Sequence, residues 1–155
     1  MIDQNPSQTE LDQALELIFY AQRAITAEPD AMLAQYEWGR VHHRILYFVA
    51  RYPGITQQAL LGILGVSKQA LHGPMKQLSQ AGLIVSKPAG HDRRARCLTL
   101  TPTGIDLEQS LSNPQRQLLA RVFQSLGNSV TVNWVTTMQA LSAHLRQPPR
   151  TEAGD

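Results

Sequence analysis

Hydrophobic residues recur every three or four positions along most of the chain, which is the spacing of amphipathic helices. The first such stretch predicts a helix over residues 9–27 that ends at Glu28-Pro29, because the residue before a proline disfavours helical geometry. A second helix is predicted over residues 30–51, and Tyr52-Pro53-Gly54 ends it.

Two shorter helices follow, and their order predicts a helix-turn-helix. Thr56 caps the first and Ser67 caps the second, and Gly65 between them suits the left-handed residue that commonly ends a helix. The residues expected to face the core are Ala59, Leu60, Ile63 and Leu64 in the first helix and Ala70, Leu71, Met75 and Leu78 in the second.

A two-stranded hairpin is predicted next. The residues from Leu83 to Val85 form its first strand, and a loop from Pro88 to Asp92 leads to the second. Leu98 and Leu100 share one face of this second strand, because side chains alternate between the faces of a strand.

The remaining chain predicts more helix. A helix begins at Thr101-Pro102, where an N-cap residue precedes a proline at the first helical position. Asn113-Pro114 predicts a kink or a restart, because a proline inside a helix removes a hydrogen bond and clashes with the preceding turn. A last helix is expected over residues 130–146, and the polar tail 147–155 is expected to be disordered.

Charge is distributed unevenly, although the formal net charge is only +2. Residues 40–96 hold nine basic side chains and one acidic one, a net charge of +8, whereas the rest of the chain holds five basic and eleven acidic ones, a net charge of −6. A basic centre between acidic ends is typical of a protein that binds a polyanion. A solvated basic face without a ligand is the alternative.

The 155 residues, 43% of them hydrophobic, suffice for one domain with a modest core. The polar start MIDQNPSQTE is unlike a signal peptide and no run approaches a membrane span, so we expect a cytoplasmic protein with no membrane partner. The single cysteine, Cys97, excludes an internal disulfide and is interpreted as a small strand residue rather than a redox sensor. Five scattered histidines predict no metal site, and no cofactor is expected.

The second helix of the predicted helix-turn-helix carries a polar face that suits DNA. Recognition helices contact base edges mainly with amides and long donors near their N-terminus. A capping serine and the helix N-terminus itself suit a phosphate group. An ordinary polar surface is the alternative. The candidate DNA-binding residues of this helix are Ser67, Lys68, Gln69, His72, Gly73 and Lys76.

The hairpin adds three guanidinium groups within four positions, those of Arg93, Arg94 and Arg96. A guanidinium is planar and always charged, and it can enter the narrow, electronegative minor groove of DNA. Asp92 joins this candidate DNA-binding set as the residue that holds one of the arginines in place through a bidentate ion pair. A surface loop with weak ion pairs is the alternative.

These motifs resemble those of the MarR family of bacterial winged-helix transcriptional regulators. The wing of that family carries an Asp-Arg-Arg signature, followed by a strand, Leu-Thr, two residues and Gly. The matching residues here are Asp92, Arg93, Arg94, Leu98, Leu100, Thr101 and Gly104, with Leu60, Leu64-Gly65-Val66-Ser67, Leu78 and Gly82-Leu83 upstream. The resemblance covers residues 32–111.

The resemblance implies a mainly α-helical fold with a small antiparallel β wing. A single domain, residues 1–155, would hold a winged helix-turn-helix lobe at 32–109 and dimerisation helices at 9–31 and 110–146. It also implies a homodimer on double-stranded DNA, at a pseudo-palindromic site with half-sites about 34–36 Å apart. Arg93 would be the arginine that enters the minor groove, with Asp92 orienting a neighbouring arginine.

Many members of the family bind a small effector, often an aromatic acid, between the dimer helices and the DNA-binding lobe. The candidate effector-binding residues here are Tyr36, Trp38, His42, His43 and Tyr47. That these aromatic residues only fill the core and the interface is the favoured alternative. His42 and His43 cannot both face one site, because helix neighbours point about 100° apart.

Two features depart from the family pattern. Leu61 stands where the family usually has an alanine facing the reading helix. Gly73-Pro74 lies midway along that helix, where both residues are unfavourable. Our hypothesis is that Gly73 makes room for its neighbours and that Pro74 bends the helix and redirects His72 and Lys76.

The sequence therefore predicts a sequence-specific transcriptional regulator, and regulators of this kind are usually repressors. Binding of an effector would change its affinity for DNA. The alternative is a non-enzymatic adaptor that binds a protein through its winged helix, and the basic centre argues against it. An enzyme is not expected, because the sequence shows no paired carboxylates, nucleophile elbow or phosphate loop.

Overall fold

The computed structural model describes residues 5–145, apart from the side chain of Arg93. Over this range the elements are α1 (Gln8–Ala34), α2 (Arg40–Arg51), β1 (Ile55–Thr56), α3 (Gln57–Leu64), α4 (Lys68–Gln80), β2 (Ile84–Ala89), β3 (Asp92–Leu100), α5 (Pro102–Leu126) and α6 (Asn128–Ser142). The mainly helical fold with a small antiparallel sheet is as predicted.

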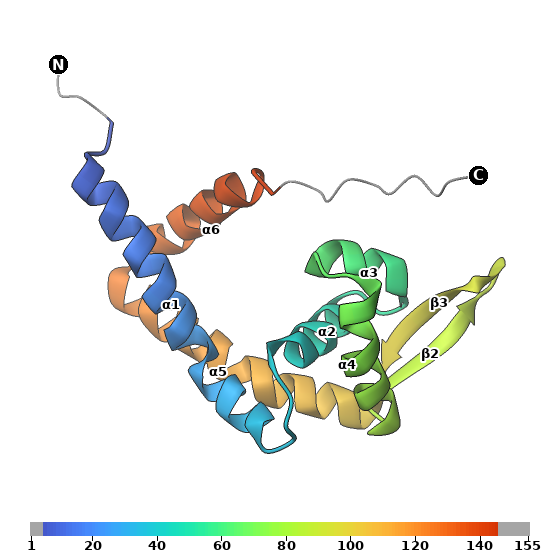
Figure 1. The fold of residues 1–155 in the computed structure, drawn as a ribbon. Helices are drawn as coiled ribbons and strands as arrows, with labels where there is room; N and C mark the ends of the chain where they lie inside the picture. The colour runs from blue at the N-terminus through green and yellow to red at the C-terminus, as the bar shows by residue number, and fades with distance from the viewer. Residues whose placement is uncertain (1–4, 146–155) are drawn as a thin grey trace, which may run out of the picture.

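Figure 1 shows a helical arm and a lobe that share one long helix. The arm consists of α1, α6 and the C-terminal part of α5, and the lobe consists of α2, α3, α4 and the sheet above the start of α5. The β2–β3 hairpin projects from the lobe as a wing. Within residues 5–145, we find no helix with the length and apolar content that a bilayer crossing requires.

One hydrophobic core holds the lobe together and ties it to both neighbouring helices of the arm. Its buried residues are Leu33, Ile45, Leu46, Val49, Leu60, Leu71, Met75, Leu78, Leu83, Ile84, Leu98 and Leu111. Ala59, Ile63 and Ala70 were expected here, and that expectation is wrong because all three are exposed. Each of these helices buries a narrower stripe than expected, and Leu61 packs against the core in place of Ile63.

The sheet has the strand order β1-β3-β2, and all its pairs are antiparallel. Leu98 of β3 is buried opposite Ile55, which fixes the base of the wing in the core. The strands reach further than predicted: β2 continues to Ala89 and β3 begins at Asp92, so only Gly90-His91 form the turn. Pro88 is tolerated because β2 is an edge strand and its pairing shifts at that point.

The predicted break at Glu28-Pro29 is wrong, because α1 continues to Ala34 and the chain turns at residues 35–39. Pro29 is buried inside the helix and has no N–H for the carbonyl of Ile25, four residues before it. The side-chain amide of Gln115, from α5, donates to that carbonyl at 2.9 Å. A distant glutamine therefore compensates for the proline.

The helix α5 starts as predicted, and Thr101 accepts a hydrogen bond from Gly104 N at 3.0 Å. The hydroxyl of Thr101 donates in turn to Gly82 O at 2.6 Å, which joins the start of α5 to the end of α4. Contrary to the expected restart, α5 runs through Pro114 as one helix. The last helix, α6, covers 128–142 rather than 130–146, and the tail 147–155 lies outside the described residues.

We expect Gln115→Met to lower the free energy of unfolding by about 1–3 kcal/mol, because it leaves the Ile25 carbonyl without a donor. Thermal or denaturant unfolding measures this, with Gln117→Met on an exposed site of the same helix as control. In a Pro29→Ala background, which restores a backbone N–H, the loss should shrink. An equal loss in both backgrounds would contradict the compensation.

Candidate nucleic-acid interface

The orientation of α4 is set by its apolar side. Leu71, Met75 and Leu78 are buried on one side of the helix. At about 100° per residue, Gln69 and Lys76 lie on the opposite side, and both are exposed. The helix therefore presents an amide and an ammonium group to solvent, as the sequence predicts for a reading helix. His72 and Lys68 are exposed beside this face.

The start of α4 is fixed by a tight turn. Gly65 has a left-handed backbone with φ of 63°, which glycine adopts without strain, and it ends α3 as predicted. The Ser67 side chain accepts a hydrogen bond from Ala70 N at 3.1 Å. The hydroxyl hydrogen of Ser67 remains available to donate to a phosphate oxygen.

The first part of the hypothesis for Gly73-Pro74, that Gly73 makes room for its neighbours, is wrong. A Cβ at Gly73 would meet no atom within 4 Å, so this glycine does not make room for Leu61 or for any other neighbour. The helix α4 is also uninterrupted from Lys68 to Gln80, with Pro74 inside it. What the glycine provides is an exposed stretch of bare backbone on the polar side of the helix, where another molecule can approach closely.

His42 connects α2 to the reading helix. Its ring is buried and stacks on Trp38 with 5.2 Å between ring centroids. The Nδ1 atom accepts a hydrogen bond from Gly39 N at 3.1 Å, so in the neutral ring the proton is on Nε2, which lies 2.7 Å from Gln77 Oε1 of α4. His42 therefore donates to the reading helix, and its expected role in an effector cleft is not supported by this placement.

The wing arginines have different roles in the structure. Arg96 donates to Ser86 Oγ and to Ser86 O, both at 2.8 Å, so it joins the two strands. Arg94 is exposed. Asp92 Oδ1 accepts from the backbone N–H of Arg94 at 2.9 Å, and no ion pair of Asp92 is found among the described side chains. The side chain of Arg93 lies outside the described residues.

A cleft of about 380 Å³ brings the two predicted parts together. It lies between the starts of α3 and α4 and strand β3, and Lys68, Arg94 and Arg96 all line it. Gln57 and Gln58 of α3 line it too. The sequence analysis missed these two amides, although their place directly after the Thr56 cap could have indicated them.

A second cleft, of about 220 Å³, lies between α1, α2 and α5. Of the expected effector residues, only His43 and Tyr47 line it, beside Arg40 and Arg44. Tyr36 instead stacks on Trp38, with 5.0 Å between the ring centroids. The structure thus divides the five candidates between a cleft and an aromatic stack.

His43 is held between helices. Its Nε2 atom lies 3.0 Å from Ser112 Oγ of α5. Burial lowers the pKa of His43 below its ordinary value, although the negative charges of Glu108 and Asp30 act in the opposite direction. Nowhere in the described range, this site included, does a group of three or more histidine, cysteine or acidic side chains form that could hold a metal ion.

The comparisons with known proteins agree with this geometry. The sequence model of the MarR family matches residues 39–95. The HTH-type transcriptional regulator PetP of Rhodobacter capsulatus is 36% identical over 132 residues, which are 85% of this chain and 80% of PetP. The chain belongs to the MarR family of transcriptional regulators. It is therefore a DNA-binding regulator, and the adaptor alternative is not favoured.

Solved structures share the MarR winged-helix fold. NadR in complex with 4-hydroxyphenylacetate aligns with a TM-score of 0.67 at 21% identity, over 94% of this chain and 99% of NadR. A mutant of S. aureus MepR, bound to an oligodeoxyribonucleotide, aligns with a TM-score of 0.58 at 16% identity, over 86% of this chain and 98% of MepR. The family membership comes from sequence, and these two likenesses concern the fold.

The lowered pKa of His43 predicts in which direction the stability of the fold changes with pH. Below about pH 6.5 the unfolded chain takes up a proton at His43 more readily than the folded chain, so stability falls as the pH falls through that region. We expect His43→Gln to reduce the loss of thermal stability between about pH 7.5 and about pH 5. His144→Gln, at an exposed site, is the control. The same pH dependence in wild type and His43→Gln would disprove this assignment.

Proposed function

We propose that the protein acts as a homodimeric repressor that binds a pseudo-palindromic site on double-stranded DNA through α4 and the wing. The observation that carries this proposal is a cleft beside the exposed polar side of α4. Lys68, at the start of α4, and Arg94 of β3 both line this cleft. A helix flanked by a cationic ribbon suits a major groove and the phosphates beside it. The MepR structure, bound to an oligodeoxyribonucleotide, has the same fold.

We assign different contacts to the two parts of this surface. In α4, Gln69, His72 and Lys76 face base edges, Gly73 allows close approach, and Ser67 and Lys68 bind phosphate groups. In the wing, Arg93 enters the minor groove, with Arg94 beside it. Asp92 orders the backbone at Arg94, and Arg96 braces the hairpin against Ser86.

The dimer proposal rests on apolar side chains that the arm leaves in solvent. Leu15 of α1 is 68% exposed and Val132 of α6 is 66% exposed. A folded monomer rarely exposes apolar surface on this scale. The exposed large hydrophobic residues of the arm include Leu11, Leu15, Ile18, Phe19, Val122, Leu126, Val132, Trp134, Val135 and Leu141. We assign dimerisation to residues 9–31 and 110–146 and the DNA-binding lobe to residues 32–109.

We also propose a small aromatic acid as effector, in the cleft between α1, α2 and α5. The exposed guanidinium group of Arg44 suits a carboxylate, whereas that of Arg40 is already paired with Asp30. His43 and Tyr47 suit an aromatic ring with a polar substituent. NadR, with the same fold, was solved in complex with 4-hydroxyphenylacetate. Such a ligand lowers DNA affinity only if it binds more tightly to a form whose lobes are spaced wrongly for DNA.

Arg93→Ala tests the wing. We expect it to weaken operator binding by about tenfold or more and to flatten the fall of log affinity with log salt concentration by about 0.9 for each phosphate that the variant no longer neutralises. Fluorescence anisotropy on fragments selected from genomic DNA measures both. Arg121→Ala removes an equal charge from α5 and should bind like wild type. Full affinity in Arg93→Ala would reject the wing assignment.

Leu15→Glu tests the dimer. A buried carboxylate at an apolar interface is costly, so we expect a monomer by light scattering and a large loss of operator affinity. Gln13→Glu adds the same charge to an exposed position of α1 and should remain dimeric. If Leu15→Glu elutes as a dimer with unchanged affinity, this face of α1 is not the interface.

A further inference from the structure

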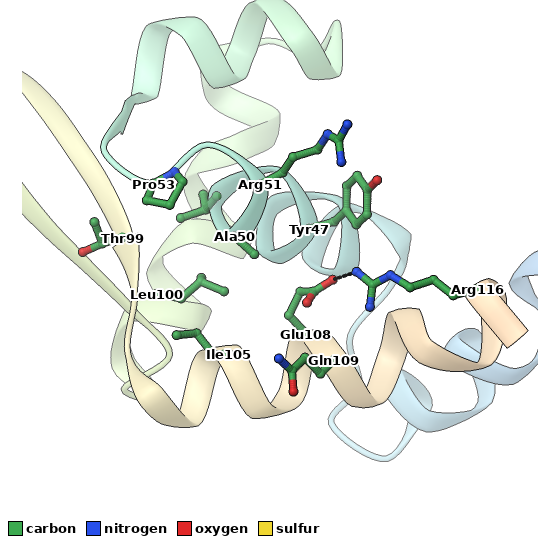
Figure 2. A pocket seen from close by; sticks show the side chains of 11 residues that line it. Tyr47, Ala50, Arg51, Pro53, Thr99, Leu100, Ile105, Glu108, Gln109 and Arg116 are labelled. Atoms are coloured by element: carbon green, nitrogen blue, oxygen red, sulfur yellow. Dashed lines mark hydrogen bonds and ion pairs between the residues drawn. The ribbon is translucent and has the colours of Figure 1, made fainter. Parts of the chain in front are cut away.

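A third cavity lies along the DNA-binding lobe and reaches Arg116 of α5, beyond residues 32–109. Its volume is about 560 Å³, and it is bounded by α2, by the end of β3 and by the start of α5 (Figure 2). No residue of α1 lines it, and it shares only Tyr47 with the cleft that holds His43. Its size is that of a small-molecule pocket.

Glu108 gives this cavity its chemistry. The residue is only 4% exposed, and Figure 2 shows its side chain rising from α5 beside the Arg116 guanidinium and below Tyr47. The Oε1 atom accepts from Arg116 at 3.3 Å, while Oε2 has no partner among the described residues. Every fully occluded side-chain oxygen and nitrogen in the described range has a partner, so Oε2 is not fully occluded, and Glu108 lines the cavity.

A buried carboxylate with a free acceptor is unfavourable unless a donor meets it. The Glu108–Arg116 contact is long for an ion pair, and Arg116 also donates to Asn113 Oδ1 at 2.8 Å. Glu108 is therefore paired on one oxygen and open on the other. A ligand with an N–H donor, above all a charged one, would complete its hydrogen bonding.

The two ends of the cavity differ. Pro53, Leu100 and Ile105 make one end apolar, and Figure 2 shows them on the side away from Arg116. The other end holds Glu108 and Arg116. One carboxylate and one guanidinium group thus face an apolar surface across the same space.

We propose that this cavity binds an apolar α-amino acid. Its ammonium group donates to Glu108 Oε2, its carboxylate pairs with Arg116, and its side chain lies on Pro53, Leu100 and Ile105. A simple carboxylic acid would bring a second negative charge to Glu108, and a simple amine would bring no anion to Arg116. A zwitterion matches the whole set of charges.

Isothermal titration calorimetry tests the site without DNA, so its outcome is separate from the proposed operator binding. The probes are phenylalanine, leucine and methionine, with phenylpropionate and phenethylamine as analogues of phenylalanine that keep one charge each. At least one amino acid should bind. If it is phenylalanine, we expect it to bind about tenfold or more tightly than either analogue. No heat from any of the three amino acids up to about 10 mM would overturn the proposal.

Two variants locate the site. Glu108→Gln should weaken the binding of the amino acid about tenfold, because the substitution removes the partner of the ammonium group. The affinity for phenylpropionate, which has no ammonium group, should stay the same or increase. Asp106→Asn removes an equal charge from an exposed position on the same helix and should change nothing. Circular dichroism confirms that each variant is folded. Unchanged amino-acid affinity in Glu108→Gln, or tighter binding of phenylpropionate than of phenylalanine to wild type, would overturn the proposal.

Discussion

The burial of one face of α4 is the constraint on which the rest of the lobe depends. Leu71, Met75 and Leu78 are buried in the core, and each such side chain contributes about 1.5–3 kcal/mol when it leaves water. The helix cannot rotate about its axis without exposing them. Its polar face is therefore directed outward by hydrophobic packing, and the hydrogen bond from His42 to Gln77 adds an oriented contact.

The basic side chains do not form one uniform patch. Arg96 is occupied within the hairpin, and its bonds to Ser86 stiffen the wing where the strands leave the core. Arg94 is exposed and shares a cleft with Lys68. Arg40 pairs with Asp30 at 2.9 Å, away from this cleft. A count of charges along the chain thus overstates how many are free to meet a polyanion.

Local chemistry made much of this fold predictable. The caps at Thr56, Ser67 and Thr101 need only a hydroxyl and an N–H three residues further on, so the sequence shows them directly. The continuation of α1 through its proline could not be foreseen, because the compensating Gln115 lies 90 residues away. The same holds for the 35-residue separation between His42 and Gln77. Pairs that are this far apart in the sequence cannot be predicted from local sequence patterns.

The length of α5 has a mechanical consequence. One end of this helix carries the lobe and the other packs with α1 and α6, so the helix works as a lever between them. Its 25 residues span about 37 Å at 1.5 Å per residue. A tilt of about 5° at the arm would move the far end by about 3 Å, roughly the length of a hydrogen bond. Pro114 removes one backbone hydrogen bond near the middle of the lever, which weakens the helix against bending at that point.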